Sequence, residues 1–210
     1  MTAEPDTHHI GAGDTEAHED GRRARRDRNR IAVVDAYLEL VREGDLHPSV
    51  ADVAVRSGVS HRSVFRYFAD KDDLAQAAVD RQLEWVRSLP PLHIDALTAL
   101  DDRLQAFIEH RASMHDGVGN VGRLSRGLAL RQPIIAEQLE RSRSTSRKQV
   151  RLAFAAELCR LDPTEANDIV SAIDTVCSFE AYDLLRRSQG LARAHVERIM
   201  ARTVRGLLAA

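Results

Sequence analysis

Aromatic residues and cysteines are scarce in this sequence. Phe, Trp and Tyr make up only 4% of the 210 residues, while Ala, Leu, Val and Arg are prominent. Because Ala, Leu and Arg are good helix formers and strands draw on aromatic residues, this composition favours helices over sheets. The two cysteines, Cys159 and Cys177, are too few for a disulfide framework and lack the spacing of metal ligands. We therefore expect two reduced, mostly buried thiols in a cytoplasmic protein without a metal site.

The signatures of membrane proteins and of common enzymes are also missing. No apolar run approaches the roughly 20 residues of a membrane-spanning helix, and residues 1–21 are polar and acidic, unlike a signal peptide. The sequence contains no His-Glu-x-x-His, Cys-x-x-Cys or Gly-x-Ser-x-Gly motif. The glycine-rich stretch DGVGNVG at 116–122 follows a predicted helix, whereas a phosphate-binding loop follows a strand. We therefore expect no membrane segment, no cofactor and no enzymatic activity.

The formal net charge of −2 hides a local asymmetry of charge. Residues 1–21 carry six acidic side chains and no Lys or Arg, whereas residues 22–30, RRARRDRNR, carry six arginines and one Asp. Such blocks of charge are typical of tails and arms that interact rather than pack. We expect residues 1–21 to be disordered. The arginine arm is expected to enter a minor groove or neutralise phosphates, and a solvated linker is the alternative.

Helical periodicity organises the chain from about residue 27 onward. Apolar residues spaced three or four apart predict a first helix, which ends at Gly44. Ser49 and Ser60 then cap two short helices that are joined by a turn at Gly58. A fourth helix ends near Pro90–Pro91, the best boundary between two parts of the chain. The stripe of the first helix consists of Ile31, Val34, Leu38 and Val41.

Five more helices are predicted after residue 92, and alternating apolar runs typical of strands are absent. The first loosens at 116–122, a shorter one reaches about Leu130, and a long one runs from Pro133 to about Arg160. The last two run from Asp162 to about residue 188 and from about 192 to 208. The fold class is therefore all-α with about nine helices. The predicted parts are a disordered tail and arm (1–26), a three-helix helix-turn-helix domain (27–75), a connecting helix (76–91) and a larger helical domain (92–210).

The two short helices and the helix before them form a helix-turn-helix arrangement. Helices of about eight residues are marginal alone, and Val53, Val64 and Phe68 allow them to pack against the first helix. Residues 56–71 hold four basic side chains and one acidic side chain, a local charge of +3. The free face of the third helix is thus suited to the major groove of DNA, which admits one helix.

The segment from Ile31 to Leu74, with DVAVRSGVSHRSVFRYFADKDDL at its centre, resembles the DNA-binding domain of the TetR (tetracycline-repressor-like) family of transcriptional regulators. Three motifs occur here in the same register as in that family: the Ala-x-x-x-Gly-Val-Ser turn, the aromatic-x-aromatic-Phe ending and the following acid-Lys-acid-acid-Leu. A later stretch, FEAYDLLRRSQGL, is similar to the regulatory domain of many members. The resemblance implies a sequence-specific DNA-binding regulator, usually a repressor, although activation stays open.

The resemblance also implies roles for single residues. Phe65 stands where the family usually has a Tyr whose hydroxyl meets a phosphate, so we interpret Phe65 as a packing residue together with Phe68. Tyr67, by contrast, is expected to face the nucleic acid. A solvated helix face is the alternative for the arginines of the third helix. The candidate DNA-binding residues are Ser49, Ser60, His61, Arg62, Ser63, Arg66, Tyr67, Lys71 and Arg28.

For the second domain, the resemblance implies a homodimer formed by the last two long helices and a small-molecule effector whose binding releases a palindromic DNA operator. The apolar residues of those helices, such as Ile173, Leu184 and Val196, are more numerous than one packing layer needs. The polar pocket candidates could instead pair with each other or lie at the dimer interface, and the others could be core. An architectural DNA-binding protein without an effector is a further alternative. The pocket candidates are Trp85, Asp101, Phe107, Arg111, Asp174, Cys177 and Tyr182.

Overall fold

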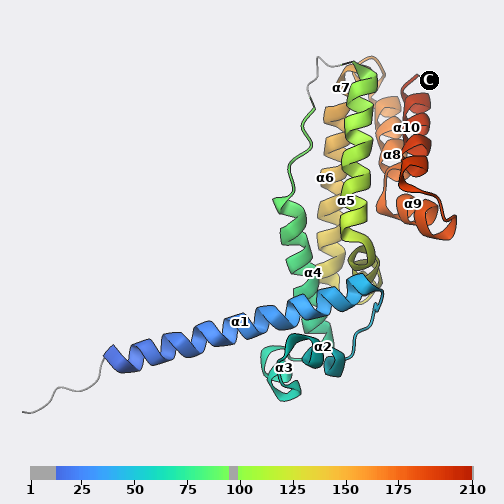
Figure 1. Cartoon of the computed structure of the whole chain (residues 1–210). Coiled ribbons are helices and arrows are strands. Elements are labelled where there is room, and N and C mark those ends of the chain that lie inside the picture. Colours follow the sequence, from blue (N-terminus) through green and yellow to red (C-terminus); the bar gives the residue numbers. More distant parts are fainter. Residues whose placement is uncertain (1–12, 95–98, 210) are drawn as a thin grey trace, which may run out of the picture. The chain divides into compact units, whose positions relative to one another are not determined.

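The computed structural model describes the backbone of residues 13–94 and 99–209, and within these ranges the side chains from residue 20 onward. Every regular element in the described ranges is helical (Figure 1), which confirms the predicted fold class. The chain forms two compact units. The first contains the residues up to 40 and residues 47–78, and the second contains residues 41–46 and the chain from 79 onward. The units therefore divide within a helix and not at Pro90–Pro91.

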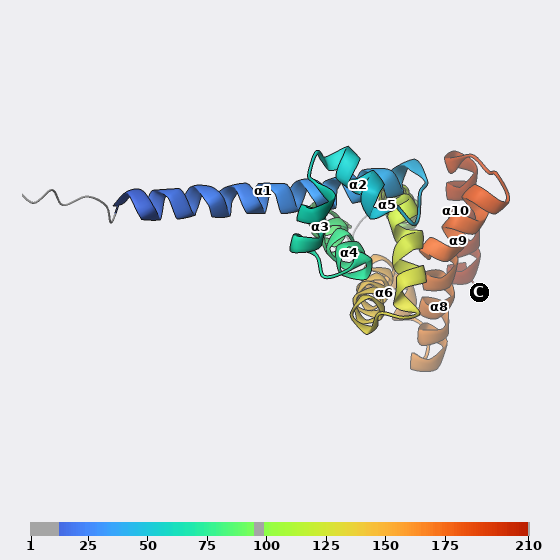
Figure 2. The same ribbon diagram turned by 90° about the horizontal axis from the view of Figure 1, so that it is seen from below.

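The first helix, α1 (Gly13–Glu43), is much longer than predicted. Figure 2 shows it as one continuous helix that includes the arginine arm. The prediction of a disordered segment 1–26 is therefore wrong for residues 13–26, while residues 1–12 lie outside the described residues. The physical reason is that this segment is rich in Ala, Glu and Arg, and extending an existing helix is far less costly than nucleating one.

Capping interactions set the ends of the next helices, as the sequence predicts. Ser49 Oγ accepts a hydrogen bond from the Asp52 amide at the start of α2 (Val50–Ser57), and Gly58 ends that helix with φ of 66°. The left-handed conformation of Gly58 suits a residue without a side chain. Ser60 caps α3 (His61–Tyr67) by accepting from the Ser63 amide. α4 (Lys71–Ser88) follows, and the Asp73 amide donates to Asp70 Oδ1 across 2.8 Å.

The core of the first unit is built by α1, α2, α3 and the first turns of α4. Five residues of the part of α1 that belongs to this unit are buried with side chains from the other helices. Phe65, in contrast, is 50% exposed, so its interpretation as a packing residue is wrong. Within the short α3, Val64 and Tyr67 are the residues that lie on the buried side. The buried residues of this core include Val33, Val34, Tyr37, Leu38, Val53, Val59, Val64, Phe68, Leu74 and Ala75.

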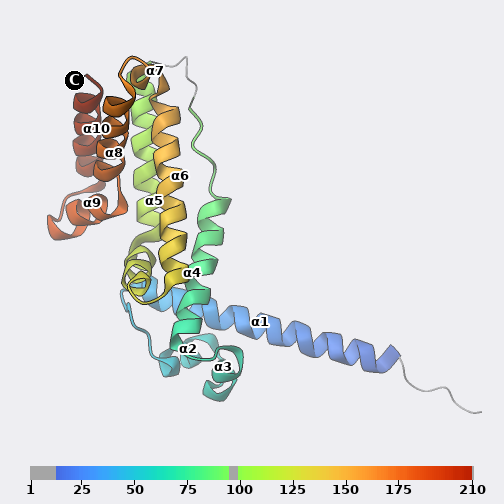
Figure 3. The same ribbon diagram turned by 180° about the vertical axis from the view of Figure 1, so that it is seen from behind.

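In the second unit, the four long helices α5 (Leu100–Ala129), α6 (Pro133–Ala153), α8 (Pro163–Val176) and α10 (Arg193–Ala209) pack together as a bundle (Figures 1 and 3). The predicted loosening at 116–122 is a kink at Gly119, where φ is 37° and ψ is −122°. None of the described helices has an apolar stretch long enough for a bilayer.

Two helices that were predicted to be continuous are broken. The one expected to reach Arg160 is interrupted at Phe154, which separates α6 from the short α7 (Ala155–Leu158). The one expected to reach residue 188 stops at Cys177, and Ser178 caps a new helix, α9 (Phe179–Asp183), which continues as the π-helical turn η1 (Leu184–Ser188). Apolar periodicity continues across both breaks, so it could not show them.

Much of the apolar surface assigned to a dimer interface is used inside the second unit. Ile173, Val196 and Val204 are fully buried in its core, with Leu104, Phe107 and Phe154. Leu184 is 53% exposed. The larger apolar residues of α8 and α10 that remain partly exposed are Ile169, Val176, Ile199, Leu207 and Leu208.

Candidate nucleic-acid interface and ligand cavity

The outer face of α3 is basic and accessible. His61, Arg62 and Arg66 are exposed, and Ser63 is half-buried. Arg62 makes no hydrogen bond or ion pair to any residue that the structure describes, so its guanidinium is available to a ligand. The His61 ring meets the exposed Phe65 ring edge-on at a centroid distance of 5.0 Å. This face therefore offers both free positive charge and an aromatic surface.

Tyr67 ties α3 to α1 instead of projecting freely. Its ring is buried, and its hydroxyl accepts hydrogen bonds from Asn29 Nδ2 at 3.5 Å and from Arg66 Nη2 at 3.2 Å. The hydrogen bonds from Asn29 and then Arg66 lower the pKa of the Tyr67 hydroxyl. Because the oxygen accepts both bonds, its own hydrogen remains able to donate to a phosphate.

The remaining predicted contact residues are occupied in local structure. Ser49 and Ser60 cap α2 and α3, and the Ser49 hydroxyl also bonds Asp52. Lys71 Nζ donates to the main-chain carbonyl of His47 across 3.0 Å, which fastens the start of α4 to the segment before α2. These residues shape the helix-turn-helix, and a contact from them to DNA stays a prediction.

The arginine arm extends along α1 as a helix with exposed guanidinium groups. Arg22, Arg26 and Asn29 follow the i, i+4, i+7 spacing and so share one face. Asn29 contacts Tyr67 of α3, and the charge of Arg26 also lowers the pKa of Tyr67. The Asn29 face therefore lies near α3, as does Arg30, whose guanidinium carbon is 5.0 Å from the centre of the Phe68 ring. Arg28, the arm residue singled out from the sequence, is exposed and lies on a different face.

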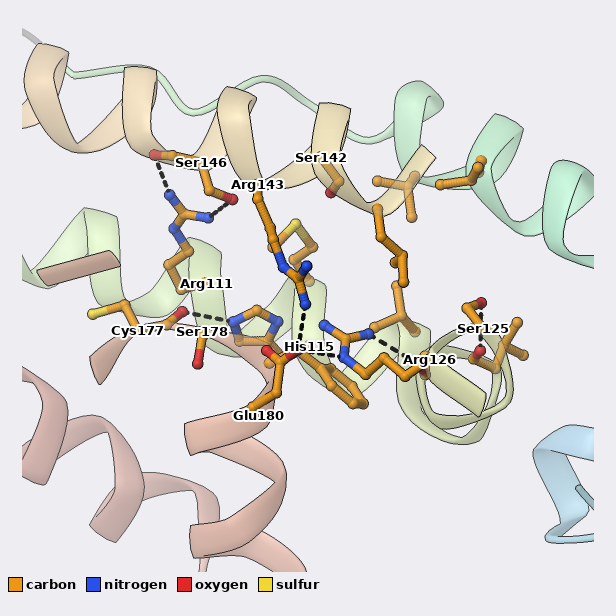
Figure 4. Close-up of a pocket in the computed structure, with 18 of the residues that line it drawn as sticks. Arg111, His115, Ser125, Arg126, Ser142, Arg143, Ser146, Cys177, Ser178 and Glu180 are labelled. Carbon is orange, nitrogen blue, oxygen red and sulfur yellow. Dashed lines mark hydrogen bonds and ion pairs between the residues drawn. The ribbon is translucent and has the colours of Figure 1, made fainter. Parts of the chain in front are cut away.

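The second unit contains a cavity of about 410 Å³ between α4, α5, α6, α8 and α9 (Figure 4). Three of the predicted pocket residues, Arg111, Asp174 and Cys177, line this cavity together. The volume falls in the range typical of small-molecule sites, which is about 300–1,000 Å³. Its apolar wall includes Val79, Leu83, Val86, Met114, Leu139 and Phe179.

The other four predicted pocket residues lie elsewhere. Phe107 is part of the core and meets Phe154 edge-on. Trp85 is 39% exposed and lies against Gly117, and Asp101 forms an exposed ion pair with Arg205 at 2.6 Å. The hydroxyl of the buried Tyr182 donates to Asp116 Oδ1 across 2.6 Å. Burial, and then the hydrogen bond to Asp116, raise the pKa of Tyr182.

Arg111 is a buried cation at the cavity wall. It is 2% exposed, and its guanidinium donates to the hydroxyl and the main-chain carbonyl of Ser146, at 2.6 and 2.9 Å. The guanidinium carbon lies 4.9 Å from the centre of the Phe107 ring. Burial lowers the pKa of Arg111, and its Nε has no hydrogen-bond partner among the described residues.

His115 and the end of α8 meet inside the same cavity, and sequence reasoning did not select this histidine. Its Nε2 lies 2.9 Å from the carbonyl oxygen of Cys177, so Nε2 donates and Nδ1 carries the lone pair of the neutral ring. Burial lowers the pKa of His115 to about 4. Burial also raises the pKa of the Cys177 thiol to about 12, which makes it a poor nucleophile at neutral pH. Cys159 is exposed, contrary to the prediction.

Glu180 is held by two arginines, as Figure 4 shows. Arg126 Nε and Arg143 Nη2 both contact Glu180 Oε1, at 2.7 and 3.1 Å. Burial by itself would raise the pKa of Glu180, but the hydrogen bonds and charges of the two arginines outweigh it and lower the pKa to about 2. Arg126 also stacks over Phe179 at 4.0 Å. The two arginines lie 54 and 37 positions from Glu180, so local sequence patterns could not bring this group together.

Comparisons with known proteins agree with this geometry. Residues 33–78 match the model of the bacterial regulatory proteins, tetR family. A transcriptional regulator from Rhodococcus sp. Rha1 has a similar fold, with a TM-score of 0.61, 19% identity and coverage of 86% of this chain and 96% of that chain. MexZ from Pseudomonas aeruginosa, a repressor responsible for antibiotic resistance, gives a TM-score of 0.55, 18% identity and coverage of 85% and 94%. No curated protein matches the sequence.

Proposed function

We propose that this chain, whose residues 33–78 match the tetR family of bacterial regulatory proteins, binds a palindromic DNA operator as a homodimer. Bound there, it represses transcription. A small molecule that enters the cavity of the second unit releases the protein from the operator. The observation that supports this most directly is the exposed, unpaired guanidinium of Arg62 on the third helix of a helix-turn-helix. Arginine forms paired hydrogen bonds with guanine in the major groove.

The proposed contacts fall into two groups. Arg62, Arg66 and His61 on the outer face of α3 read base edges. Tyr67 and the Asn29-face arginines of α1 contact phosphates, because they extend the same basic surface. The helical form of α1 makes the arm a continuation of this surface. Lys71 joins them if DNA draws it away from the His47 carbonyl.

A homodimer is supported by the apolar side chains that remain accessible on the last helices. Leu184 is 53% exposed, and Ile169, Val176 and Ile199 are only partly buried. Two copies bring two recognition helices to the half-sites of a palindrome.

Coupling between the cavity and the DNA-binding unit is supported by Gln82. This buried residue lines the cavity and accepts a hydrogen bond from Arg42 Nη2 at 2.9 Å. The Arg42 carbonyl in turn accepts from Asn120 Nδ2 at 3.0 Å. Arg42 lies in the end of α1 that belongs to the second unit, and the preceding part of the same helix contributes to the core of the DNA-binding unit. A ligand that displaces Gln82 therefore acts on α1 directly.

The test is binding to a duplex selected from a random library, followed by fluorescence anisotropy over a salt series. We expect saturable binding with a steep negative salt slope. Arg62→Ala should weaken binding by about 1–3 kcal/mol, whereas Arg160→Ala, an exposed arginine of the second unit, should not. Failure to select a palindromic site, or equal loss in the two variants, would contradict the proposal.

A further inference from the structure

The cavity contains a buried positive charge without a matching negative charge. Arg111 forms no ion pair with any described residue, and its only hydrogen-bond acceptors are the two oxygens of Ser146. Both acceptors are neutral, and Nε has none. A buried charge is costly unless it is paired and fully hydrogen-bonded. The folded protein therefore keeps at its cavity wall a cation that an anion would satisfy.

The other charges of the cavity do not supply that anion. The lining holds three arginines, Arg111, Arg126 and Arg143, against two carboxylates, Asp174 and Glu180. Glu180 is already bonded by Arg126 and Arg143. The positive charges thus exceed the negative ones by one before any ligand binds.

Asp174 is the remaining carboxylate, and it is a weak partner. It lies 3.8 Å from Arg147, and no ion pair within 4.0 Å joins it to Arg111. Burial raises the pKa of Asp174, although the charge of Arg111 opposes that change. A carboxylate beyond contact distance offsets the charge of a guanidinium only in part and satisfies none of its hydrogen-bond donors.

From this imbalance we propose that the cavity binds a small organic acid, a carboxylate on an apolar body, with the carboxylate paired to Arg111. The carboxylate accepts from the guanidinium, whose planar donors suit it. The apolar body packs against the wall formed by residues such as Leu83, Met114 and Phe179. The binding of a carboxylate in the cavity does not depend on the proposed function. Only the further step, that this carboxylate is the effector that releases DNA, rests on it.

The experiment uses three families of matched probes on the full chain. 2-Naphthoate, 4-phenylbutyrate and decanoate are each compared with the primary amide and the amine of the same carbon skeleton. Thermal denaturation and titration calorimetry report binding, because a ligand of the folded state raises its stability. We expect at least one carboxylate to raise the denaturation temperature in a concentration-dependent way, more than its amide and its amine do.

Variants then locate the interaction. Arg111→Met should weaken carboxylate binding about tenfold or more, since a hydrogen-bonded charge pair is lost. It should still fold, because apolar replacement of an unpaired buried charge is often neutral or stabilising. Arg141→Met, in the exposed pair with Glu137, is the matched control and should bind normally. Asp174→Asn should tighten carboxylate binding, because it removes a repulsive charge.

Two results would overturn the inference. One is that no carboxylate stabilises the protein more than its amide does. The other is that the amines bind best and lose affinity in Asp174→Asn, which would make Asp174 the ligand contact. Either result leaves binding to the selected duplex untouched and so does not count against the DNA-binding role. Conversely, Arg111-dependent carboxylate binding that leaves DNA affinity unchanged would support the ligand class and contradict the effector role.

Discussion

His115 donates its Nε2 hydrogen to the main-chain carbonyl of Cys177 across 2.9 Å, and this bond joins α5 to the point where α8 ends. Cys177 is the C-cap of α8, and carbonyls at a helix end lack partners within the helix. The imidazole therefore satisfies a group that the break between α8 and α9 leaves free. Through this contact a residue 62 positions away in the sequence helps to fix the wall of the cavity.

The first prediction concerns the pH dependence of stability. His115 has a pKa of about 4 in the folded protein and about 6.5 when unfolded. Below pH 6.5 the unfolded chain therefore binds more protons, so stability falls as the pH falls from about 6.5 to 4, by roughly 3 kcal/mol for this group. Urea denaturation at several pH values should show a smaller fall in His115→Gln. Cys177, with a pKa of about 12, does not titrate in this window. Glu180, with a pKa of about 2 in the folded protein and 4.5 when unfolded, adds to the fall near the acid end of the window, but it does so equally in both proteins. An equal fall in the free energy of unfolding with pH in the wild type and in His115→Gln would contradict the prediction.

A second prediction concerns the pair of Arg103 and Glu157. The guanidinium contacts both carboxylate oxygens, at 2.9 and 2.6 Å, and the Ala153 carbonyl at 2.6 Å. Glu157→Gln should destabilise the protein by about 1.5–3 kcal/mol, because it removes the charge from a two-point, charge-assisted pair with a buried guanidinium. Glu137→Gln, in an exposed i,i+4 pair, should cost less than about 0.5 kcal/mol and is the control.

The same pair predicts a loss of stability in acid. The hydrogen bond from Arg103 lowers the pKa of Glu157. The stabilisation is therefore present above the ordinary pKa of glutamate and is lost as the pH falls through the lower folded value. Denaturant unfolding should show a larger loss of stability in acid for the wild type than for Glu157→Gln. A pair that stays stabilising well below the pKa of the folded state would contradict this reasoning.

Phe65 and Tyr67 should respond to substitution in opposite ways. Phe65 is half exposed, so Phe65→Ala should change stability by less than about 0.5 kcal/mol while it weakens DNA binding. Tyr67→Ala should destabilise the unit by about 3–5 kcal/mol, as loss of a buried ring does. Because an exposed ring can contact a thymine methyl group, the Phe65→Ala effect should shrink on a duplex with deoxyuridine in place of thymidine. An unchanged effect would exclude that contact.

The two faces of the arginine arm predict different effects of charge removal. Arg26 lies near Tyr67, and Arg28 lies on another face of α1. Arg26→Gln should lower the slope of log K against log salt by about one, whereas Arg28→Gln should leave it nearly unchanged. Circular dichroism should show the same helix content in both variants. Equal slopes would mean that the arm acts only as a diffuse charge.

Gln82 predicts a variant that separates DNA binding from its control. Gln82→Met keeps the size of the side chain but loses the hydrogen bond from Arg42 and the one that Gln82 donates to the Gly117 carbonyl. Operator affinity without ligand should change little, while the reduction in affinity caused by a bound ligand should diminish. Anisotropy titrations with and without a carboxylate probe measure both quantities. A variant in which the ligand still releases DNA fully would show that the coupling follows another route.

The sequence by itself determined the helical fold, the helix-turn-helix and most capping residues, because these depend on short-range signals. Ser49, Gly58 and Ser60 act within a few residues of their own position. Periodicity did not reveal which aromatic residue of α3 is buried, since the helix has only seven residues and the orientation of Phe65 and Tyr67 depends on packing against α1.

The charge pairs and hydrogen bonds of the cavity, by contrast, were decided by the tertiary structure alone. Arg111 and Ser146 lie on different helices 35 positions apart, and Arg126 and Glu180 are separated by 54 positions. The breaks at Phe154 and Cys177 also escaped prediction, because apolar spacing continues through them. The local spacing of apolar residues indicates which side of a helix is buried. The hydrogen-bond and ion-pair partners of a buried charge, however, are determined only when distant helices pack together.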